Sequence, residues 1–486
     1  MSFFSNISDF AKIGHVLKEN RVLFQQCPEI VPIFSPGASS VLILLTSASN
    51  LLDLCYNNLL FKRFRRIRMR YAAQKGTRDI LPSEIYNWQL AEKTFANVCH
   101  SFGYEEIRIP TFEQTDLFQR GVGDTTDVVT KEMYTFEDKG GRSITLRPEG
   151  TAGVVRSFIE NGMTSLPSPV RLFYNITAFR YEKMQKGRMR EFHQFGLESF
   201  GSAGPDIDAE IISVVDVFFR KMGLKNIALH INSIGCPTCR KAYNTLLKDY
   251  FRPHVSTMCE DCQARFEKNP LRMIDCKVDG GKDIVKNAPR LIDHLCDDCK
   301  AHFEALKTRL EAIGISYTID PNIVRGLDYY TRTVFEFVSE NVGTQGTICG
   351  GGRYDGLVED CGGTATPGIG FAMGVERLLL EAEAQGVLKE APSYTRIYIA
   401  SMSDAAKIEA LKLCYALRLA DIGCETDMAG RSFKAQMKYA GKQGIPFLAV
   451  IGDDELASGE VKVKCMADGT ETPVKLDGLV DFMAGK

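Results

Sequence analysis

The sequence carries almost no net charge and has no long uninterrupted apolar run. Its 486 residues include 59 lysines and arginines against 61 aspartates and glutamates, so the formal net charge is −2. This balance excludes a protein coated with basic side chains for nucleic-acid binding, although a local basic groove is compatible with it. Hydrophobic residues at 44% and charged residues at 25% exclude a disordered, collagen-like or multispan membrane chain. A chain of this length is expected to form about two to four domains.

The common glycine-rich phosphate-binding motifs are missing as well. Residues 349–355 contain three consecutive glycines, yet they match neither G-x-x-x-x-G-K-[ST] nor G-x-G-x-x-G. The sequence therefore argues against a P-loop or dinucleotide-binding fold.

Residues 1–68 differ in composition from the rest of the chain. An apolar stretch at 41–60 is interrupted by serine, asparagine and aspartate and is followed by a basic run at 61–68. Three interpretations are open: a transmembrane helix, a transit peptide, and translation that begins at Met69. A transmembrane span needs about 20 mainly apolar residues, and acidic residues such as Asp9 and Glu19 are unusual in transit peptides. We favour a start at Met69, with 1–68 as an atypical extension, and expect no membrane association.

Cysteine is concentrated in one part of the chain. Seven of the 15 cysteines lie between residues 236 and 299, six of them in three C-x-x-C pairs. In a chain of this length, such a cluster favours a reducing compartment and a metal site. The spacing of two pairs fits a structural zinc site, with Cys236, Cys239, Cys259 and Cys262 as the first choice of ligands. The alternative is that these thiols pack as small hydrophobic side chains.

The spacing of apolar residues predicts a mixed helical and β-rich core. We expect a helix over 83–102 with Ser83 as its N-cap, and a short strand over 105–110 that ends at Pro110. Two β-rich runs, 171–182 and 190–201, are joined by a charged segment, which predicts a long hairpin. Further on we expect helices at 205–222 and 286–313, a strand at 329–338 and a strand-to-helix passage at 368–378.

A second, smaller domain is expected at the C-terminus. A linker at 386–394 precedes strands and helices that alternate in the manner of an α/β domain. The expected strands are 396–401, 446–452 and 460–466, and the expected helices are 404–423 and 432–444.

The predicted hairpin carries most of the chemistry. Because side chains alternate along a strand, Gln194 and Glu198 share one face, about 13 Å apart, while His193 lies on the other face and is expected to pack in the core. Arg180 lies near the hairpin tip, which also contains Lys183, Lys186, Arg188 and Arg190. Guanidinium groups bind phosphate oxygens bidentately, so the tip suits a polyphosphate or an RNA end. The alternative is a solvated hairpin whose charges only maintain solubility.

Two other polar segments lie beside predicted strands. Residues 146–151 follow a strand and open a helix, where N–H groups and a carboxylate can hold a small charged ligand. Residues 325–330, with the sequence RGLDYY, precede another strand.

Taken in order, these motifs resemble a known family. The strand ending at Pro110, the arginine-bearing hairpin and the strand-to-helix passage resemble the three signature motifs of class II aminoacyl-tRNA synthetases. Residues 325–330 and 350–355 are similar to the histidine-recognition motifs of the histidyl-tRNA synthetase family, as is the opening segment 75–82. The resemblance covers about residues 69–486 and implies an α+β fold. It implies a class II catalytic core (69–390) with an antiparallel sheet flanked by helices, a mainly helical insertion (236–320) and an α/β anticodon-binding domain (394–486).

The resemblance also implies roles for individual residues. Arg180 and Arg325 would be catalytic and lie on opposite sides of the α-phosphate of ATP, and the ATP-binding residues would be Arg180, Arg188 and Arg377. Histidine would be held by residues from four segments of the chain: Glu149, Gly150, Thr151, Arg180, Gln194, Glu198, Arg325, Tyr329 and Tyr330.

The resemblance further implies an activity, cofactors and partners. The enzyme would ligate L-histidine to histidine tRNA through a histidyl-adenylate, with AMP and pyrophosphate as products. ATP with Mg²⁺ would be required, and the protein would be a cytoplasmic homodimer that meets its partner near the first motif. The main alternative is a relative of the regulatory subunit of ATP phosphoribosyltransferase, which lacks the C-terminal domain and usually the ATP-binding arginines. Another class II specificity is disfavoured by residues 325–330.

Overall fold

The computed structural model describes residues 71–123, 126, 128–276, 278–341 and 346–486. The predicted extension at 1–68, with its three interpretations, lies outside these residues. Residues 75–486 form one compact unit. Within the described part of the chain, none of the helices combines the length and the apolar character that a membrane crossing requires.

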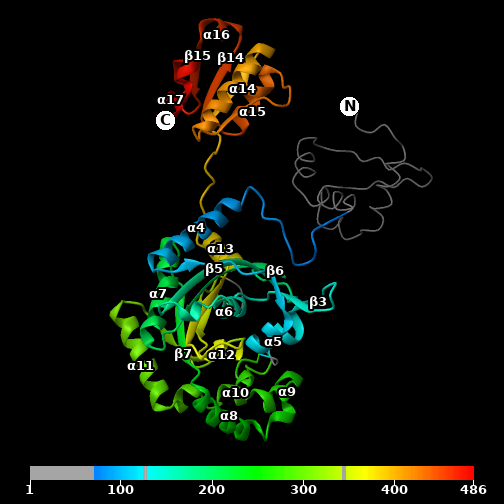
Figure 1. The fold of residues 1–486 in the computed structure, drawn as a ribbon, viewed down its shortest axis with the longest axis vertical. Coiled ribbons are helices and arrows are strands. Elements are labelled where there is room, and N and C mark those ends of the chain that lie inside the picture. Colours follow the sequence, from blue (N-terminus) through cyan, green and yellow to red (C-terminus); the bar gives the residue numbers. More distant parts are fainter. Residues whose placement is uncertain (1–70, 124–125, 127, 277, 342–345) are drawn as a thin grey trace, which may run out of the picture. The chain divides into compact units, whose positions relative to one another are not determined.

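A large, mainly antiparallel sheet forms the centre of the N-terminal part (Figure 1). Its middle strands are β5 (Val170–Phe179), β6 (Glu191–Phe200), β11 (Gly368–Gly374) and β10 (Thr347–Arg353), which are neighbours in that order. Next to β10 follow β9 (Thr331–Val338), β7 (Ala228–Ser233) and β8 (Thr318–Ile319), and β1 (Glu105–Glu106) lies at the opposite edge. The predicted hairpin is β5 and β6, which pair from Val170 with Phe200 to Phe179 with Glu191. The predicted α+β fold with an antiparallel sheet is confirmed.

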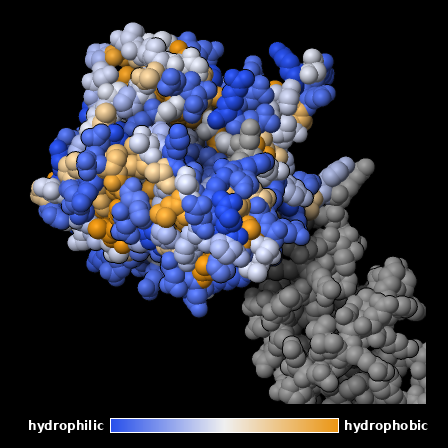
Figure 2. Space-filling model, turned by 90° about the horizontal axis from the view of Figure 1, so that it is seen from below, coloured by the Kyte–Doolittle hydropathy of each residue, from blue (hydrophilic) through white to orange (hydrophobic). Residues whose placement is uncertain are grey.

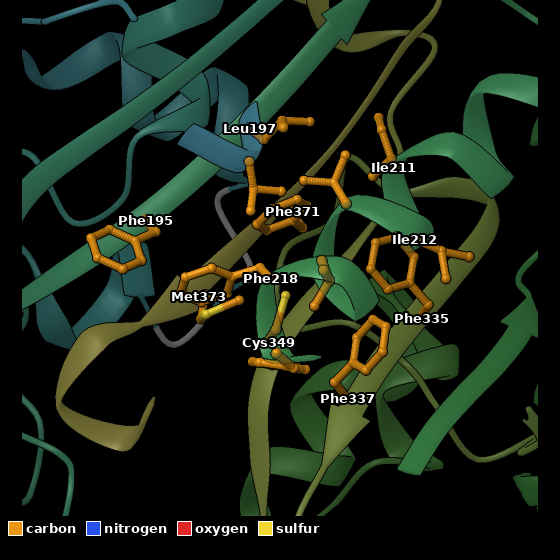
Figure 3. Packing of buried hydrophobic residues seen from close by; sticks show 14 of the residues in the cluster. Phe195, Leu197, Ile211, Ile212, Phe218, Phe335, Phe337, Cys349, Phe371 and Met373 are labelled. Carbon is orange, nitrogen blue, oxygen red and sulfur yellow. The ribbon is translucent and has the colours of Figure 1, made fainter. Parts of the chain in front are cut away.

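One face of this sheet is covered by apolar packing. Figure 3 shows Phe195 and Leu197 of β6 and Phe371 of β11 beside residues of α7 (Pro205–Lys221), such as Phe218. These side chains are at most 2% exposed, and burial of each contributes about 1.5–3 kcal/mol. The helix α4 (Ile85–Ser101) packs into the same cluster through Trp88 and Phe95. The apolar face fixes the orientation of β6, so its alternate residues must point to the opposite face.

The predicted N-cap of α4 is wrong. The helix begins at Ile85 with Glu84 as the N-cap residue, and no side chain caps it. The Glu84 carboxylate accepts a hydrogen bond from the Leu81 N–H at 3.2 Å, and residues 82–84 form a turn before the helix. The predicted strand at 105–110 is reduced to β1, which pairs in parallel with β5.

A small sheet and two helices connect the first motif to the large sheet. The strands are β2 (Phe112–Gln114), β4 (Ser143–Leu146) and β3 (Tyr134–Glu137), in that order. Between β2 and β3 lies α5 (Thr115–Val122), and α6 (Thr151–Glu160) follows β4. The strand-to-helix passage predicted at 146–151 is therefore present.

The cysteine-rich segment is built from short helices. It contains α8 (Pro237–Phe251), α9 (Glu260–Lys268) and α10 (Asp283–Lys286), with 3₁₀ turns between them, before α11 (Asp297–Ala312). The helix predicted over 286–313 thus starts only at Asp297. Pro289 lies between α10 and the 3₁₀ turn at Leu291–His294, where its ring and missing N–H are incompatible with a continuous helix.

The C-terminal part has its own five-stranded sheet, in the order β13-β12-β14-β15-β16. The predicted elements appear as β12 (Ile397–Ser401), α14 (Asp404–Leu419), α15 (Phe433–Lys442), β14 (Phe447–Ile451) and β15 (Glu460–Cys465). The structure adds β13 (Cys424–Thr426), α16 (Asp453–Ser458), β16 (Glu471–Lys475) and α17 (Leu479–Ala484). The linker is preceded by α13 (Val375–Ala384), which follows β11 as predicted. On the face seen in Figure 2, hydrophobic residues form small groups among mainly hydrophilic ones.

A buried charge network joins α7 to the large sheet. Arg353 and Asp208 are both 0% exposed, and a guanidinium nitrogen of Arg353 lies 2.7 Å from a carboxylate oxygen of Asp208. His302 of α11 and Thr333 of β9 contact the other oxygen of Asp208 at 2.8 and 2.6 Å. The Asp208 carboxylate of α7 therefore contacts side chains of three other elements, β9, β10 and α11.

We expect Arg353→Ala to lower the free energy of unfolding by about 3–5 kcal/mol, because it leaves the Asp208 charge buried without its main partner. The matched control is Arg309→Ala, which removes a pair with Asp206, also on α7, where the aspartate is 78% exposed. That control should cost less than about 1 kcal/mol. Denaturant unfolding followed by the fluorescence of Trp88, the single tryptophan, measures both values. Equal losses in the two variants would contradict the role of the buried pair.

Candidate active site

The face of the sheet opposite the apolar cluster carries the predicted polar residues. Gln194 and Glu198 are 7% and 0% exposed, and both lie on the β6 face that does not meet α7. Glu198 is paired with Gly370 of β11. A Cβ atom on Gly370 would lie 1.9 Å from a Glu198 carboxylate oxygen. The glycine therefore provides the space that the Glu198 side chain occupies. As predicted, His193 points the other way, where its ring packs on Trp88 and contacts Glu376 at 2.9 Å.

Glu198 is surrounded by hydroxyl groups. Thr151 and Tyr174 donate hydrogen bonds to one carboxylate oxygen at 2.8 and 3.1 Å, and Tyr354 donates to the other. Burial raises the pKa of Glu198 to about 8, against the opposing effect of the Tyr354 and Thr151 hydrogen bonds. The carboxyl therefore binds a proton far more strongly than a solvated glutamate does.

Glu149 fixes the start of α6 beside this carboxyl. Its carboxylate accepts hydrogen bonds from the N–H groups of Thr151 and Ala152 at 2.6 and 2.8 Å. Burial raises the pKa of Glu149, although both N–H bonds oppose the change. A Cβ atom on Gly150 would lie 2.4 Å from the Tyr174 ring, so the backbone approaches that ring closely. The predicted residues 149–151 are thus brought to Glu198.

The segment 325–330 precedes β9, and its Arg325 side chain packs over β10. The Arg325 guanidinium forms an ion pair with Glu336 of β9 and lies 5.8 Å from the centre of the Tyr330 ring. A Cβ atom on Gly350 would be 2.5 Å from that guanidinium. Tyr329 and Tyr330 pack together with their ring centres 4.7 Å apart, and Tyr329 also contacts the Tyr354 ring at 5.7 Å. The tyrosines connect the Arg325 segment to the surroundings of Glu198.

The predicted phosphate-binding arginines lie near the hairpin tip. Arg180 donates from Nε to the Pro148 carbonyl at 2.8 Å. Glu182 lies 3.7 Å from Arg180 and 3.2 Å from Arg188, and so holds the two guanidinium groups close together. A Cβ atom on Gly187 would lie 3.1 Å from the Arg377 side chain, which places α13 against the tip. The structure therefore gathers three arginines from the hairpin and α13 into one region.

Sequence reasoning missed Tyr174, Tyr354 and Glu336. Tyr174 is paired with Gly196 across β5 and β6, so the alternation of β5 would have identified it once the hairpin register was known. Glu336 lies on a predicted strand, but nothing in the sequence indicates which side chain it meets.

Residues of the cysteine-rich segment also hold the 325–330 backbone. Arg240 of α8 donates to the Tyr330 carbonyl at 2.8 Å, and Arg272 donates to the Arg325 carbonyl at 2.6 Å. The Asn269 amide donates to the Asp328 carboxylate at 3.0 Å. The conformation of the Arg325 segment therefore depends on the insertion.

The four cysteines chosen from the sequence as zinc ligands are not brought together. Cys236 and Cys239 are grouped with Cys296 and Cys299, whereas Cys259 and Cys262 are grouped with Cys276 and Asp279. The fold therefore pairs the first and the third C-x-x-C motifs, and the middle motif is grouped with Cys276 and Asp279, which are nearer to it along the chain.

The antiparallel sheet, with arginines and buried carboxylates on one face and a separate α/β domain after it, agrees with the class II aminoacyl-tRNA synthetase architecture that the sequence motifs predict. Comparison with known families gives the same class of protein and identifies the family within it. The family model described as histidyl-tRNA synthetase matches residues 76–378, and that of an anticodon binding domain matches residues 396–486. The chain belongs to the histidyl-tRNA synthetase family.

Individual relatives support this assignment. A histidine–tRNA ligase of Acetivibrio thermocellus is 62% identical over 408 residues, which is 84% of this chain and 98% of that protein. One from Caldicellulosiruptor saccharolyticus is 54% identical over 418 residues, covering 86% of this chain and 100% of the relative. The structure of apo histidyl-tRNA synthetase from S. aureus matches with a TM-score of 0.74 and 41% identity, over 85% of this chain and 99% of that one. The predicted family and its ATP-dependent charging of histidine tRNA are confirmed.

The raised pKa of Glu198 predicts a pH-dependent stability. Between its ordinary pKa and about 8, the folded protein keeps the Glu198 proton and the unfolded chain loses it, so stability falls as pH rises. From pH 5 to pH 8 we expect Glu198 to contribute a fall of about 2–4 kcal/mol. Glu198→Gln should remove this contribution, whereas Glu105→Gln, at an exposed position on β1, should not. Unfolding free energies of the three proteins at both pH values test this, and the same fall in all three would contradict it.

Proposed function

We propose that the chain activates L-histidine with ATP to histidyl-adenylate and transfers the histidyl group to the 3′-terminal ribose of histidine tRNA. AMP and pyrophosphate are the products. The observation that carries the proposal is the position of Arg325, a half-buried cation held between Glu336 and Tyr330 on the sheet face that also bears Gln194 and Glu198. A fixed positive charge at this place is suited to negative charge that develops during phosphoryl chemistry.

Histidine would bind on this sheet face, between Glu198 of β6 and the segment 325–330. Neutral imidazole has one donor and one acceptor nitrogen, so a carboxyl and a phenol can recognise both. Glu198 and Tyr330 supply these groups, with Tyr329 packed beside them. Glu149, Gly150, Thr151 and Gln194 would hold the α-amino and carboxylate ends. The Gln194 side-chain oxygen is buried without a hydrogen-bond partner among the described residues, which suits an acceptor for the α-amino group.

ATP would lie along the hairpin tip. Arg180 would bind the α-phosphate, Arg188 the outer phosphates, and Arg377 would pack near the adenine and the γ-phosphate, since a planar cation can stack and donate at once. Mg²⁺ would accompany ATP and offset part of the charge of its phosphates beside Arg188, because it prefers phosphate and water oxygens to a cage made only of protein ligands.

The reaction would be an in-line attack of the histidine carboxylate on the α-phosphorus. Arg180 and Arg325, from opposite sides, would offset the charge that spreads over the phosphate oxygens as pyrophosphate departs. Positioning and charge neutralisation supply most of the rate in such transfers, so no protein general base is required.

The remaining features of the proposal follow from the family. The C-terminal domain would bind the tRNA anticodon, two chains would form a homodimer near the first motif, and the enzyme would work in the cytoplasm. Structural Zn²⁺ in the insertion would have no catalytic role. The regulatory-subunit alternative is disfavoured because Arg180, Arg188, Arg325 and Arg377 are all present and the C-terminal domain is intact.

Replacing Arg325 tests the proposal. Arg325→Ala should keep the fold and slow histidine-dependent ATP–pyrophosphate exchange by about 100-fold or more, with a smaller effect on histidine binding, because the lost cation acts mainly in the transition state. The control is Arg171→Ala on β5, which loses a partly exposed pair with Glu210 and a contact with the Tyr104 ring, both away from the site, and should exchange at nearly the unaltered rate. A near-normal exchange rate in Arg325→Ala would refute the assignment.

A further inference from the structure

The insertion brings eight potential ligands into two compact groups. The base cluster consists of Cys236, Cys239, Cys296 and Cys299, and the inner cluster of Cys259, Cys262, Cys276 and Asp279. Within each cluster, one ligand atom from every residue lies within 4.8 Å of all the others. Each cluster thus has the number of ligands that a tetrahedral metal site requires.

The distances between Sγ atoms are those expected around a tetrahedral metal ion, and they are too long for disulfide bonds. In the base cluster, the Sγ atom of Cys236 lies 3.7 Å from that of Cys239 and 3.9 Å from that of Cys296. In the inner cluster, the Cys259 and Cys276 Sγ atoms are 3.6 Å apart. A disulfide would need about 2.05 Å, whereas four thiolates about 2.3 Å from one zinc ion lie about 3.8 Å from each other.

The surroundings of the sulfurs also suit thiolate ligands. The N–H of Cys296 donates to the Cys239 sulfur at 3.1 Å, and the N–H of Asp279 donates to the Cys276 sulfur at 3.3 Å. These backbone N–H groups are not ligand atoms themselves, and hydrogen bonds of this kind orient metal-bound thiolates. In the inner cluster Asp279 is 0% exposed, and its carboxylate is fixed by the Cys259 N–H at 2.8 Å and by Lys282 at 2.7 Å.

We propose that the insertion binds two structural zinc ions, one in the base cluster and one in the inner cluster. The base cluster joins the residue before α8 to the residue before α11, and therefore ties the start of the insertion to its last long helix. The inner cluster ties α9 to the segment after η5 (Pro270–Met273). The insertion already buries apolar side chains such as Tyr243, Leu247 and Phe251, and bound metal ions would add cross-links between its helices.

The two sites lie next to the contacts that hold the catalytic segment. Arg240 follows the base ligand Cys239 directly in α8, and its guanidinium binds the Tyr330 carbonyl. Arg272 lies in η5, between the inner ligands Cys262 and Cys276, and binds the Arg325 carbonyl. Zinc would therefore act as a positioning element for the Arg325 segment, without contact to either substrate.

Metal content tests the proposal directly. The full chain, purified without chelator in the presence of Zn²⁺ and then desalted, should retain two zinc ions. Cys299→Ser and Cys262→Ser should each retain one, and Cys465→Ser, at a half-buried cysteine outside both clusters, should retain two. Cys299→His, which keeps a zinc ligand, should also retain two. Fewer than two ions in the unaltered protein, or two in Cys299→Ser, would overturn the assignment.

A second measurement uses the unaltered protein and does not depend on whether a variant folds. Stepwise displacement of zinc by a mercurial that binds thiols should release two ions, and Co²⁺ in their place should give the absorption bands of tetrahedral thiolate coordination. Release of no metal would overturn the proposal.

The positioning role rests on the proposed function, and it is tested by an activity measurement that is separate from the measurement of metal content. Removal of zinc should lower histidine-dependent pyrophosphate exchange by about tenfold or more, because small displacements of catalytic groups cost large factors in rate, and Zn²⁺ but not Mg²⁺ should restore it. Unchanged exchange after complete removal of zinc would refute the positioning role. Absence of exchange in the zinc-loaded protein would instead refute the proposed function.

Discussion

The two-residue alternation of β6, held in register by β5 and β11, is the constraint on which the site depends. Phe195 and Leu197 are buried against α7, so Gln194 and Glu198 must face the other way. A shift of one residue in this register would place the carboxyl among phenylalanines and remove both polar groups from the site. The apolar packing in Figure 3 therefore specifies the chemistry of the opposite face, although none of its side chains takes part in it.

Space on that face is created by glycines, and its shape is completed by the insertion. Gly350 and Gly370 leave room for the Arg325 guanidinium and the Glu198 carboxylate, where any Cβ atom would collide with them. The backbone of residues 325–330 is then held from the far side by Arg240 and Arg272. The conformation of residues 325–330 is in this way linked to the insertion through the carbonyl groups of Tyr330 and Arg325.

Much of this arrangement was predictable from local patterns. The hairpin, the strand-to-helix passages and the alternation that pairs Gln194 with Glu198 follow from short-range periodicity, which residues 171–201 display clearly. Tyr174 belongs to the predicted hairpin and needed only its register, whereas Tyr354 was not predictable as a partner of Glu198 because it reaches it through strand pairing between distant segments. The cysteine grouping failed for the same reason: spacing along the chain favoured Cys239 with Cys259, whereas the fold brings Cys236 to Cys296. The starts of α4 and α11 also differ from the predicted ones, because a turn precedes Ile85 and because Pro289 and a 3₁₀ turn at Leu291–His294 interrupt the helical pattern before Asp297.

The central claim is that this sheet face selects histidine and activates it with ATP. The most direct measurement is ATP–pyrophosphate exchange by the purified, unaltered chain with each standard amino acid supplied in turn. The account predicts rapid exchange with histidine and none above background with any other amino acid. Exchange that depends on a different amino acid, or histidine binding without exchange, would contradict it.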